Sequence, residues 1–207
     1  MYGVSERYLN VYGEKDLRAQ MNQFFHRTYT HPVDGTTLDM KMLCNWYWYD
    51  ETAILETGKG TKDWNFYRYA ETLLSAAEAI AQSSGVNAEA AGYLAQVKAR
   101  ANMEGKDVST IASELQRLGK QAFIEECWKE RLREFPLEMK IWDDCVRTGK
   151  FPQISATNKG EVQFVDLIGA TNGSGAKFKE TDLYWPIPVN EIQRNPNLTQ
   201  NEGYSAK

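Results

Sequence analysis

Residues 68–79 read Arg68-Tyr-Ala-Glu-Thr-Leu-Leu-Ser-Ala-Ala-Glu-Ala79, and their apolar residues recur at the spacing of a helix. The pattern predicts an amphipathic helix over residues 63–82, with Asp63 as its N-cap and Gly85 just beyond its end. The stripe expected to be buried along this helix consists of Phe66, Tyr69, Ala70, Leu73, Ala77 and Ile80.

A second helix is predicted over residues 87–103, with Ala91, Leu94, Val97 and Ala101 facing inward. Because only a short Ser-Ser-Gly turn separates the two helices, they should pack antiparallel as a helical hairpin. This hairpin has the size of one tetratricopeptide unit, although no internal repeat of that length is visible. The expected fold class is therefore mainly α.

Further helices are expected along the chain. A helix capped by Ser109 or Thr110 comes first, and stronger patterns follow over residues 120–135 and 137–147. Pro136 marks a bend between the last two, because proline cannot donate the backbone hydrogen bond of a helix interior.

The first 62 residues have a mixed pattern. The turn Pro32-Val-Asp-Gly35 separates residues 27–30 from residues 36–38, as in a β-hairpin. A helix is the alternative for the residues before this turn, with an apolar stripe formed by Leu17, Met21, Phe24 and Phe25.

Two further strands are expected. Residues 42–49 are rich in Trp and Tyr, which favours a strand. Alternation along it places one pair of rings, Trp46 and Trp48, on one face, and Tyr47 and Tyr49 on the other. Residues 156–178 are rich in Gly, Asn, Thr, Ser and Lys, and predict a long surface loop around one short strand at residues 162–167.

The charge composition argues against nucleic-acid binding, and the aromatic content is high. Lys and Arg number 24 against 28 Asp and Glu, a net charge of −4, and no long basic run occurs, so nucleic-acid binding is not expected. Six Trp, eleven Tyr and eight Phe make 12% of the chain, and such large rings must fill a core, an interface or a ligand site.

Cysteine and histidine are too few for most catalytic or metal sites. Cys44, Cys127 and Cys145 have no metal-ligand spacing and are expected to be small buried apolar residues. With only His26 and His31, a histidine-rich metal site or a Ser-His-Asp arrangement is hard to build, and no cofactor is expected. No apolar run approaches the ~20 residues that span a bilayer, and the first residues lack the pattern of a secretion signal.

Three stretches, in order, share a pattern with a known family. They are Arg68-Tyr-Ala-Glu-Thr-Leu-Leu-Ser-Ala-Ala-Glu-Ala79 with Val97-Lys-Ala-Arg-Ala101; Glu130-Arg-Leu-Arg-Glu134 with Glu138, Trp142, Asp144 and Arg147-Thr-Gly-Lys150; and Trp185-Pro-Ile-Pro188 with Glu191 and Asn195-Pro-Asn-Leu-Thr-Gln-Asn-Glu-Gly-Tyr204. Together they resemble the C-terminal half of the RagB/SusD family, over about residues 63–204. The chain departs from the family pattern at Pro136, Met139, Ile141 and Val146, which puts in doubt a charge network around the last of these helices.

The resemblance implies tetratricopeptide-like helical hairpins with loop-rich regions and a few short strands. It also implies a non-catalytic lipoprotein of the outer membrane and cell surface, part of a starch-utilisation type of system. Such proteins capture oligosaccharides or peptides and deliver them to a SusC-like TonB-dependent transporter. Because the lipid-anchored N-terminus and the first helices of the family have no counterpart here, we expect the chain to be a fragment of a longer protein.

A glycan site needs aromatic rings that stack on sugar faces and polar groups that read hydroxyls. Residues 1–62 are therefore expected to form a mixed loop and strand region on the ligand side of the protein. Residues 63–207 are expected to form a helical region with a closing loop segment. The candidate ligand-binding residues are Tyr8, Asn10, Tyr12, Arg18, Tyr29, Asn45, Trp46 and Trp48. The alternative for Trp46 and Trp48 is that they are core residues of a half-buried strand.

Two other functions stay open at this point. The runner-up is a tetratricopeptide-type protein-interaction scaffold without glycan binding. A glycoside hydrolase would require a carboxylate pair, either Asp143 with Asp144 or Glu134 with Glu138. Residues four apart share one helix face rather than flank a substrate, so an enzyme is not expected.

Overall fold

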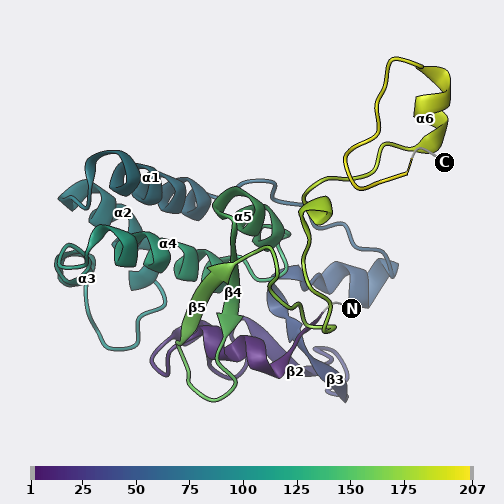
Figure 1. Ribbon diagram of the computed structural model, residues 1–207. Coiled ribbons are helices and arrows are strands. Elements are labelled where there is room, and N and C mark those ends of the chain that lie inside the picture. The colour runs from purple at the N-terminus through teal and green to yellow at the C-terminus, as the bar shows by residue number, and fades with distance from the viewer. Residues whose placement is uncertain (1–2, 206–207) are drawn as a thin grey trace. The chain divides into compact units, whose positions relative to one another are not determined.

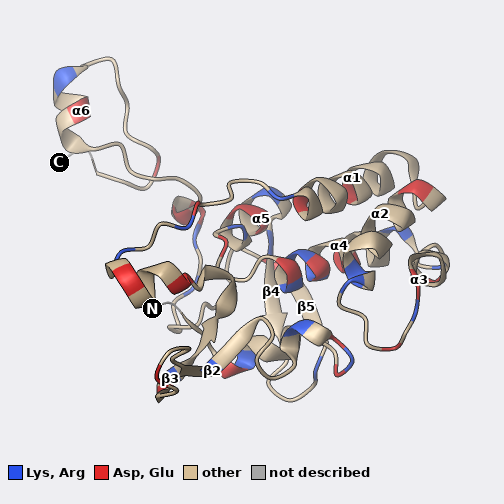
Figure 2. Ribbon diagram, turned by 180° about the vertical axis from the view of Figure 1, so that it is seen from behind, with Lys and Arg blue, Asp and Glu red and all other residues tan. Residues whose placement is uncertain are grey.

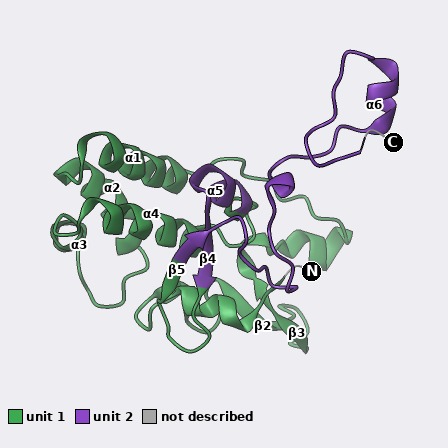
Figure 3. Ribbon diagram, in the orientation of Figure 1, with its two compact units in different colours: residues 1–141, 154–163 green, residues 142–153, 164–207 purple. Residues whose placement is uncertain are grey.

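A computed structural model describes residues 3–205. Contacts divide the chain into two compact units, shown in Figure 3: residues 1–141 with 154–163, and residues 142–153 with 164–207. The boundary at residue 62 falls inside the first unit and stays a prediction about where a ligand would bind. Most of the regular structure is helical, with a few short strands, as predicted.

The core of the first unit is built by helices. These are α1 (Tyr69–Ser84), α2 (Ala88–Ala99), α3 (Val108–Leu115) and α4 (Lys120–Glu134). In Figure 1, α1 and α2 lie side by side and α4 lies next to them, and the contacts agree. The residues that meet in this core are mostly Ala and Leu, including Leu73, Leu74, Ala77, Ala91 and Leu94. The packing of α1 against α2 confirms the predicted hairpin. The small alanines let the two helices approach closely.

The start of α1 differs from the prediction. The helix begins at Tyr69 with an extended Arg68 (φ −122°, ψ 151°) as N-cap, not with Asp63. Phe66 and Tyr69 are exposed rather than buried. The guanidinium of Arg68 donates to the carboxylates of Glu134, the last residue of α4, and of Glu138 just after it, which fixes the backbone at this point. The helix ends at Gly85, as predicted, with the positive φ of 81° that glycine tolerates.

Side-chain caps and backbone angles set the other helix ends. Asp107, not Ser109 or Thr110, caps α3 by accepting a hydrogen bond from Thr110 N at 2.8 Å. Helix α5 (Ile141–Thr148) begins later than predicted. Leu137 and Met139 have φ of 61° and 59°, a left-handed conformation that interrupts a helix.

The N-terminal part of the first unit is a small sheet with irregular turns. Strands β1 (Gly3–Val4), β3 (Thr37–Asn45) and β2 (Phe25–Thr30) lie in the order β1-β3-β2, and both pairings are antiparallel. The hairpin around residues 32–35 is confirmed. Two 3₁₀ turns precede it, η1 (Glu6–Val11) and η2 (Leu17–Ala19).

The helical stripe through Leu17, Met21, Phe24 and Phe25 is wrong. Only η2 is helical there, and Phe25 belongs to β2. Met21 is exposed, and Phe25 instead packs edge-on against Tyr12 with ring centroids 5.9 Å apart. Sheet pairing with β3 has thus overridden the local helical spacing.

The aromatic strand predicted over residues 42–49 is half right. Strand β3 ends at Asn45, and residues Trp46–Trp48 form a 3₁₀ turn, η3. The Asn45 side chain accepts a hydrogen bond from Tyr47 N at 2.8 Å, which caps this turn and stops the strand. The alternation that placed Trp46 and Trp48 on one face therefore does not apply. A π-helical turn, η4 (Ala53–Thr57), follows.

The second unit contains α5, strands β4 (Lys150–Ile154) and β5 (Val162–Asp166) over most of their length, η5 (Glu180–Leu183) and α6 (Val189–Arg194). The strand at β5 was predicted and its partner β4 was not. The closing segment folds on itself: the Gln200 side chain bonds to both backbone groups of Ile187, and the Tyr204 hydroxyl donates to backbone oxygens of Thr181 and Tyr184.

Buried ion pairs hold α4 to the chain around it. Figure 2 shows acidic and basic residues interleaved along α4. Arg68 bonds to Glu134 at 2.9 Å and to Glu138 at 2.7 Å, so charged groups of the family motifs do pair here despite the departures in sequence. The three cysteines are buried, as predicted. None of the helices within residues 3–205 combines the length and apolarity needed to cross a bilayer.

Candidate functional site

An aromatic cleft of the first unit opens where β3 ends. It has a volume of about 860 Å³. Its lining is mostly apolar and comes from β2, β3, η3 and the chain after it, with rings from Tyr29, Trp46, Trp48 and Tyr49. A cleft of this size with many rings and few charges is typical of a small-molecule site.

Trp46 is clamped between two other rings. The His26 ring lies 3.8 Å from the Trp46 ring, centroid to centroid and 10° from parallel, and the Tyr49 ring lies 4.4 Å away and 9° from parallel. Two rings this close to one indole would collide if both lay on the same face, so they cover opposite faces. Trp46 therefore presents its edge to the cleft, while Tyr49 and Tyr29, with centroids 6.0 Å apart, form the adjoining wall.

A second aromatic stack follows directly. Trp48 and Trp64 are stacked, with ring centroids 4.4 Å apart and planes 29° apart. Tyr47 contacts Trp48 edge-on at 4.9 Å. Trp64 is 49% exposed, so one of its surfaces is open to solvent beside the cleft.

The titratable groups at the cleft are neutral or fully engaged. Burial, and then the neighbouring Tyr29 hydroxyl, raise the pKa of Tyr49, so it remains a phenol that can donate a hydrogen bond at neutral pH. Burial lowers the pKa of His26, whose ring stacks on Trp46 but does not line the cleft, so this imidazole is uncharged as well. Hydrogen bonds from the Thr61 and Ala53 amides lower the pKa of Asp50, which stays ionised. The cleft thus favours an uncharged ligand with hydroxyl groups.

The structure brings together four of the eight predicted ligand-binding residues: Tyr29, Asn45, Trp46 and Trp48. Of these, Asn45 is already engaged, because its amide donates to Pro136 O at 2.8 Å and its oxygen caps η3. The rings of Tyr29 and Trp48 and the edge of Trp46 line the cleft.

The other four predicted residues lie away from the cleft, and their polar atoms bind the protein. The hydroxyls of Tyr8 and Tyr12 donate to the carbonyls of Leu132 and Arg133, at 2.6 and 2.9 Å, and Tyr12 is fully buried. The side chains of the remaining two, Asn10 and Arg18, bond to Ser155 O and to a cluster of carboxylates. These residues join segments of the first unit.

Three ring residues of this region were not predicted as site residues: His26, Tyr49 and Trp64. The prediction of a continuous strand assigned Tyr49 to the face opposite Trp46, and this obscured their stacking. The signal that could have found the turn is the short sequence Asn45-Trp-Tyr-Trp48, since asparagine caps a turn two residues on. No local signal in the sequence pairs Trp64 with Trp48.

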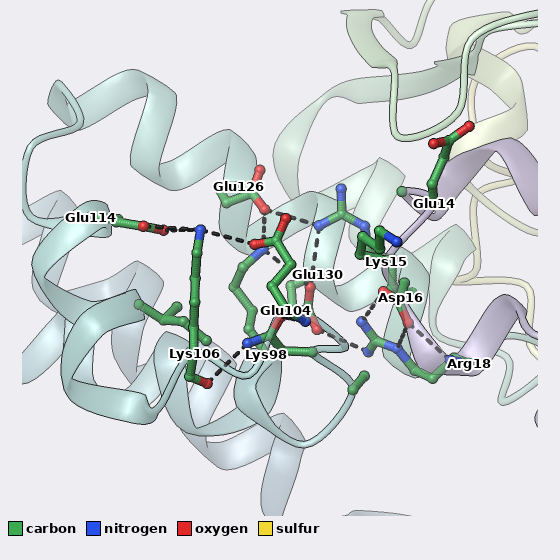
Figure 4. A pocket seen from close by; sticks show the side chains of 15 residues that line it. Glu14, Lys15, Asp16, Arg18, Lys98, Glu104, Lys106, Glu114, Glu126 and Glu130 are labelled. Carbon is green, nitrogen blue, oxygen red and sulfur yellow. Dashed lines mark hydrogen bonds and ion pairs between the residues drawn. The ribbon is translucent and has the colours of Figure 1, made fainter.

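A second pocket of the first unit is small and charged. It has a volume of about 370 Å³ and lies between the chain around residue 16 and helices α2 to α4 (Figure 4). Arg18 contacts Glu130 at 2.9 Å and Glu134 at 3.1 Å, and Arg133 contacts Glu126 at 2.9 Å and Glu130 at 3.2 Å. Nearly every charge in this pocket therefore has a partner within the protein.

Three of the four carboxylates considered for catalysis bind arginine side chains. Glu134 and Glu138, one carboxylate pair considered for a hydrolase, both bind Arg68. In the other pair, Asp144 bonds to Arg147 at 2.7 Å. Among residues 3–205, no three His, Cys, Asp or Glu side chains gather as metal ligands would.

Comparisons with known proteins agree with the sequence pattern. The model of the SusD family matches residues 10–204. The Starch-binding protein SusD of Bacteroides thetaiotaomicron is 36% identical over 138 residues, which are 67% of this chain and 21% of that protein. A solved structure of a SusD superfamily protein from Parabacteroides distasonis is similar with a TM-score of 0.80 and 31% identity, covering 97% of this chain and 41% of that one. The matches thus span about a fifth and about two fifths of the lengths of these relatives.

Proposed function

This chain belongs to the SusD family, and from that premise we propose that it binds oligosaccharides at the aromatic cleft and catalyses no reaction on them. The observation that carries the proposal is the group of rings, Tyr29, Trp46, Trp48 and Tyr49, around one cleft of about 860 Å³. The apolar faces of sugar rings stack on aromatic side chains, and their hydroxyls bond to polar groups at the edges.

The chemistry of the cleft supports a neutral polyhydroxylated ligand. The Tyr49 phenol at the cleft is neutral, as is the His26 ring that stacks on Trp46, and the Asp50 carboxylate accepts hydrogen bonds from backbone amides. A relative 36% identical to this chain is named a starch-binding protein, so α-linked glucose oligosaccharides are the first ligands to test.

The wider role follows from the family. The protein would act at the cell surface as part of an outer-membrane lipoprotein and pass its ligand to a SusC-like TonB-dependent transporter. Of the described residues that line the cleft, Asp50 alone carries a carboxylate, which supports a binding role, because glycoside hydrolysis typically uses two carboxylates that flank the bond.

The test is a titration of the protein with malto-oligosaccharides and with a panel of other plant and host glycans, followed by calorimetry. We expect saturable binding to at least one glycan class, no release of reducing ends, and a loss of about tenfold or more in affinity for Trp48→Ala, as expected for a stacking side chain. Trp185→Ala is the matched control, because Trp185 is 87% exposed and belongs to the second unit. Absence of binding to every glycan would overturn the proposal in favour of an interaction scaffold, and sugar turnover would favour a hydrolase.

A further inference from the structure

A short segment beside the cleft, residues 58–65, has no regular secondary structure, yet the protein holds it at several points. Two glycines of the segment, Gly58 and Gly60, line the cleft. The segment lies between η4 and α1 and is exposed throughout. An exposed stretch of this kind is usually free to move unless specific contacts fix it.

Asp50 is the main anchor of this segment. Its Oδ2 accepts hydrogen bonds from Thr61 N at 2.8 Å and from Lys62 N at 3.1 Å, while its Oδ1 accepts one from Ala53 N at 3.1 Å. A single carboxylate thus ties the turn at η4 to the returning chain. These charge-assisted bonds account for the lowered pKa of Asp50.

Two further contacts fix the far end of the segment. The Lys62 ammonium donates to Tyr47 O and lies 5.2 Å from the centre of the Tyr47 ring. The Asn65 amide donates to the Tyr47 hydroxyl at 2.7 Å. Trp64 lies between these two residues, so its backbone is held from both sides.

The anchored residue is a large apolar side chain left half in water. Trp64 stacks on Trp48, yet 49% of it remains exposed. Exposed apolar surface costs roughly 25 cal/mol per Å² relative to burial. Because the indole is fixed in this position, its exposed surface can stack against another apolar face. It lies next to Trp48, which lines the cleft, so a sugar chain longer than the cleft could reach it.

We propose that residues 58–65 form a clasp that holds Trp64 beside Trp48 as an outer stacking platform, which extends the aromatic cleft to longer oligosaccharides. The inference rests on the proposed function and adds to it the length of ligand that the site prefers. Asp50 is a positioning residue in this arrangement: it acts through the clasp and does not stack on the ligand.

Binding of a short and a long ligand tests the platform. Maltose and maltoheptaose are titrated into the unaltered protein and into Trp64→Ala. Removing the platform should lower the affinity for maltoheptaose about fivefold to tenfold and change that for maltose less than twofold, about the effect of one aromatic contact. Trp64→Tyr should restore most of the loss, and Trp185→Ala should change neither ligand.

A measurement without ligand tests the clasp. Two stacked indoles couple electronically and give a paired positive and negative circular dichroism band. This band should be present in the unaltered protein and absent from Trp64→Ala. It should also be weakened in Asp50→Ala, where both tryptophans remain but the anchor is lost.

The outcomes separate the two proposals. Equal losses for maltose and maltoheptaose, or no loss for either, would overturn the outer platform while leaving glycan binding intact. An unchanged dichroism band in Asp50→Ala would overturn the anchoring role of Asp50. If the unaltered protein bound no glycan in the panel, the proposed function would fail and the platform with it.

Discussion

The two pockets of the first unit differ in how their functional groups are used. In the charged pocket of Figure 4, the buried Glu130 carboxylate contacts Arg18 at 2.9 Å and Arg133 at 3.2 Å. In the aromatic cleft, the rings stack on one another but leave edges and faces open, as at Trp64. A pocket whose polar groups are already paired holds the fold together, whereas one with open surfaces can hold a ligand.

The difference has a cause in the elements that build each pocket. Glu130 lies on α4, and its partner Arg18 comes from a turn more than a hundred residues earlier, so this ion pair joins distant parts of the chain. The cleft is local, because its rings come from a hairpin and the turn that follows it. Substitutions should therefore affect stability in the charged pocket and ligand binding in the aromatic cleft.

The largest expected effect is that of Glu130→Ala. Glu130 is fully buried and lies near three cations, Arg18, Lys98 and Arg133. Removing one partner from a buried ionic cluster leaves the others unpaired, so we expect a loss of about 3 to 5 kcal/mol in the free energy of unfolding. Urea denaturation followed by circular dichroism measures it.

The matched control lies in the same pocket. Glu104 bonds to Lys106, but its side chain is 48% exposed. Glu104→Ala should cost less than about 1 kcal/mol, since exposed pairs contribute little. If the two variants lost equal amounts of unfolding free energy, a buried ion pair would stabilise this pocket no more than an exposed one, which contradicts the prediction.

Acid should unfold the protein through the same cluster. Burial alone would raise the pKa of Glu130, but Arg18, Lys98 and Arg133 outweigh it and lower the pKa from 4.5 to about 2. A carboxyl with a depressed folded-state pKa stabilises the fold above its unfolded pKa, and this contribution is lost as pH falls from about 5 to about 2. The loss should reach roughly 3 kcal/mol.

The measurement is a series of urea titrations between pH 7 and pH 2. Glu130→Ala provides the control, because it lacks the titrating group and its stability should fall less steeply over the same range. If both proteins lost stability in parallel, the acid sensitivity would have to come from other carboxyls.

The helical core was predictable because its pattern is local. The spacing of Leu73, Ala77, Ala91 and Leu94 places them on facing stripes, and all four are buried in the core of the first unit. The end at Gly85 was predictable for the same reason. By contrast, the start of α1 at Arg68 depends on ion pairs to Glu134 at the end of α4 and to Glu138 beyond it, which no local pattern contains.

The sequence predicted the aromatic character of the candidate site but only some of its residues. An aromatic-rich stretch indicates stacking, and Trp46, Trp48 and Tyr29 do share one cleft. Tyr8 and Tyr12 have the same residue type, but their hydroxyls meet carbonyl groups on α4 that lie over 120 residues away. Burial of that kind follows from the tertiary fold, so composition could not separate these tyrosines from those at the cleft.

A moderate effect is expected for His26→Ala. The His26 ring supports one face of Trp46 at 3.8 Å, and its removal leaves that indole free to tilt. We expect a loss of about 1 kcal/mol in the free energy of unfolding, and a threefold to fivefold loss in glycan affinity, about the worth of one aromatic pair. His31→Ala is the control, because the His31 ring meets Tyr29 edge-on at 6.2 Å rather than stacking on Trp46. Equal affinity of the two variants would show that Trp46 needs no support.

The smallest expected effect is that of salt on glycan binding, and it sharpens the contrast between the pockets most directly. Salt screens charge pairs but acts little on the stacking of neutral rings. Tyr49 is a neutral phenol, His26 is uncharged at neutral pH, and the Asp50 carboxylate is bound to backbone amides. Raising the ionic strength from about 0.05 M to about 0.5 M should therefore change the affinity for a neutral oligosaccharide less than twofold. Calorimetry at the two salt concentrations measures it, with maltoheptaose as the ligand. A loss of tenfold would mean that the ligand contacts charged groups, and the binding site would then have to be sought at the charged pocket.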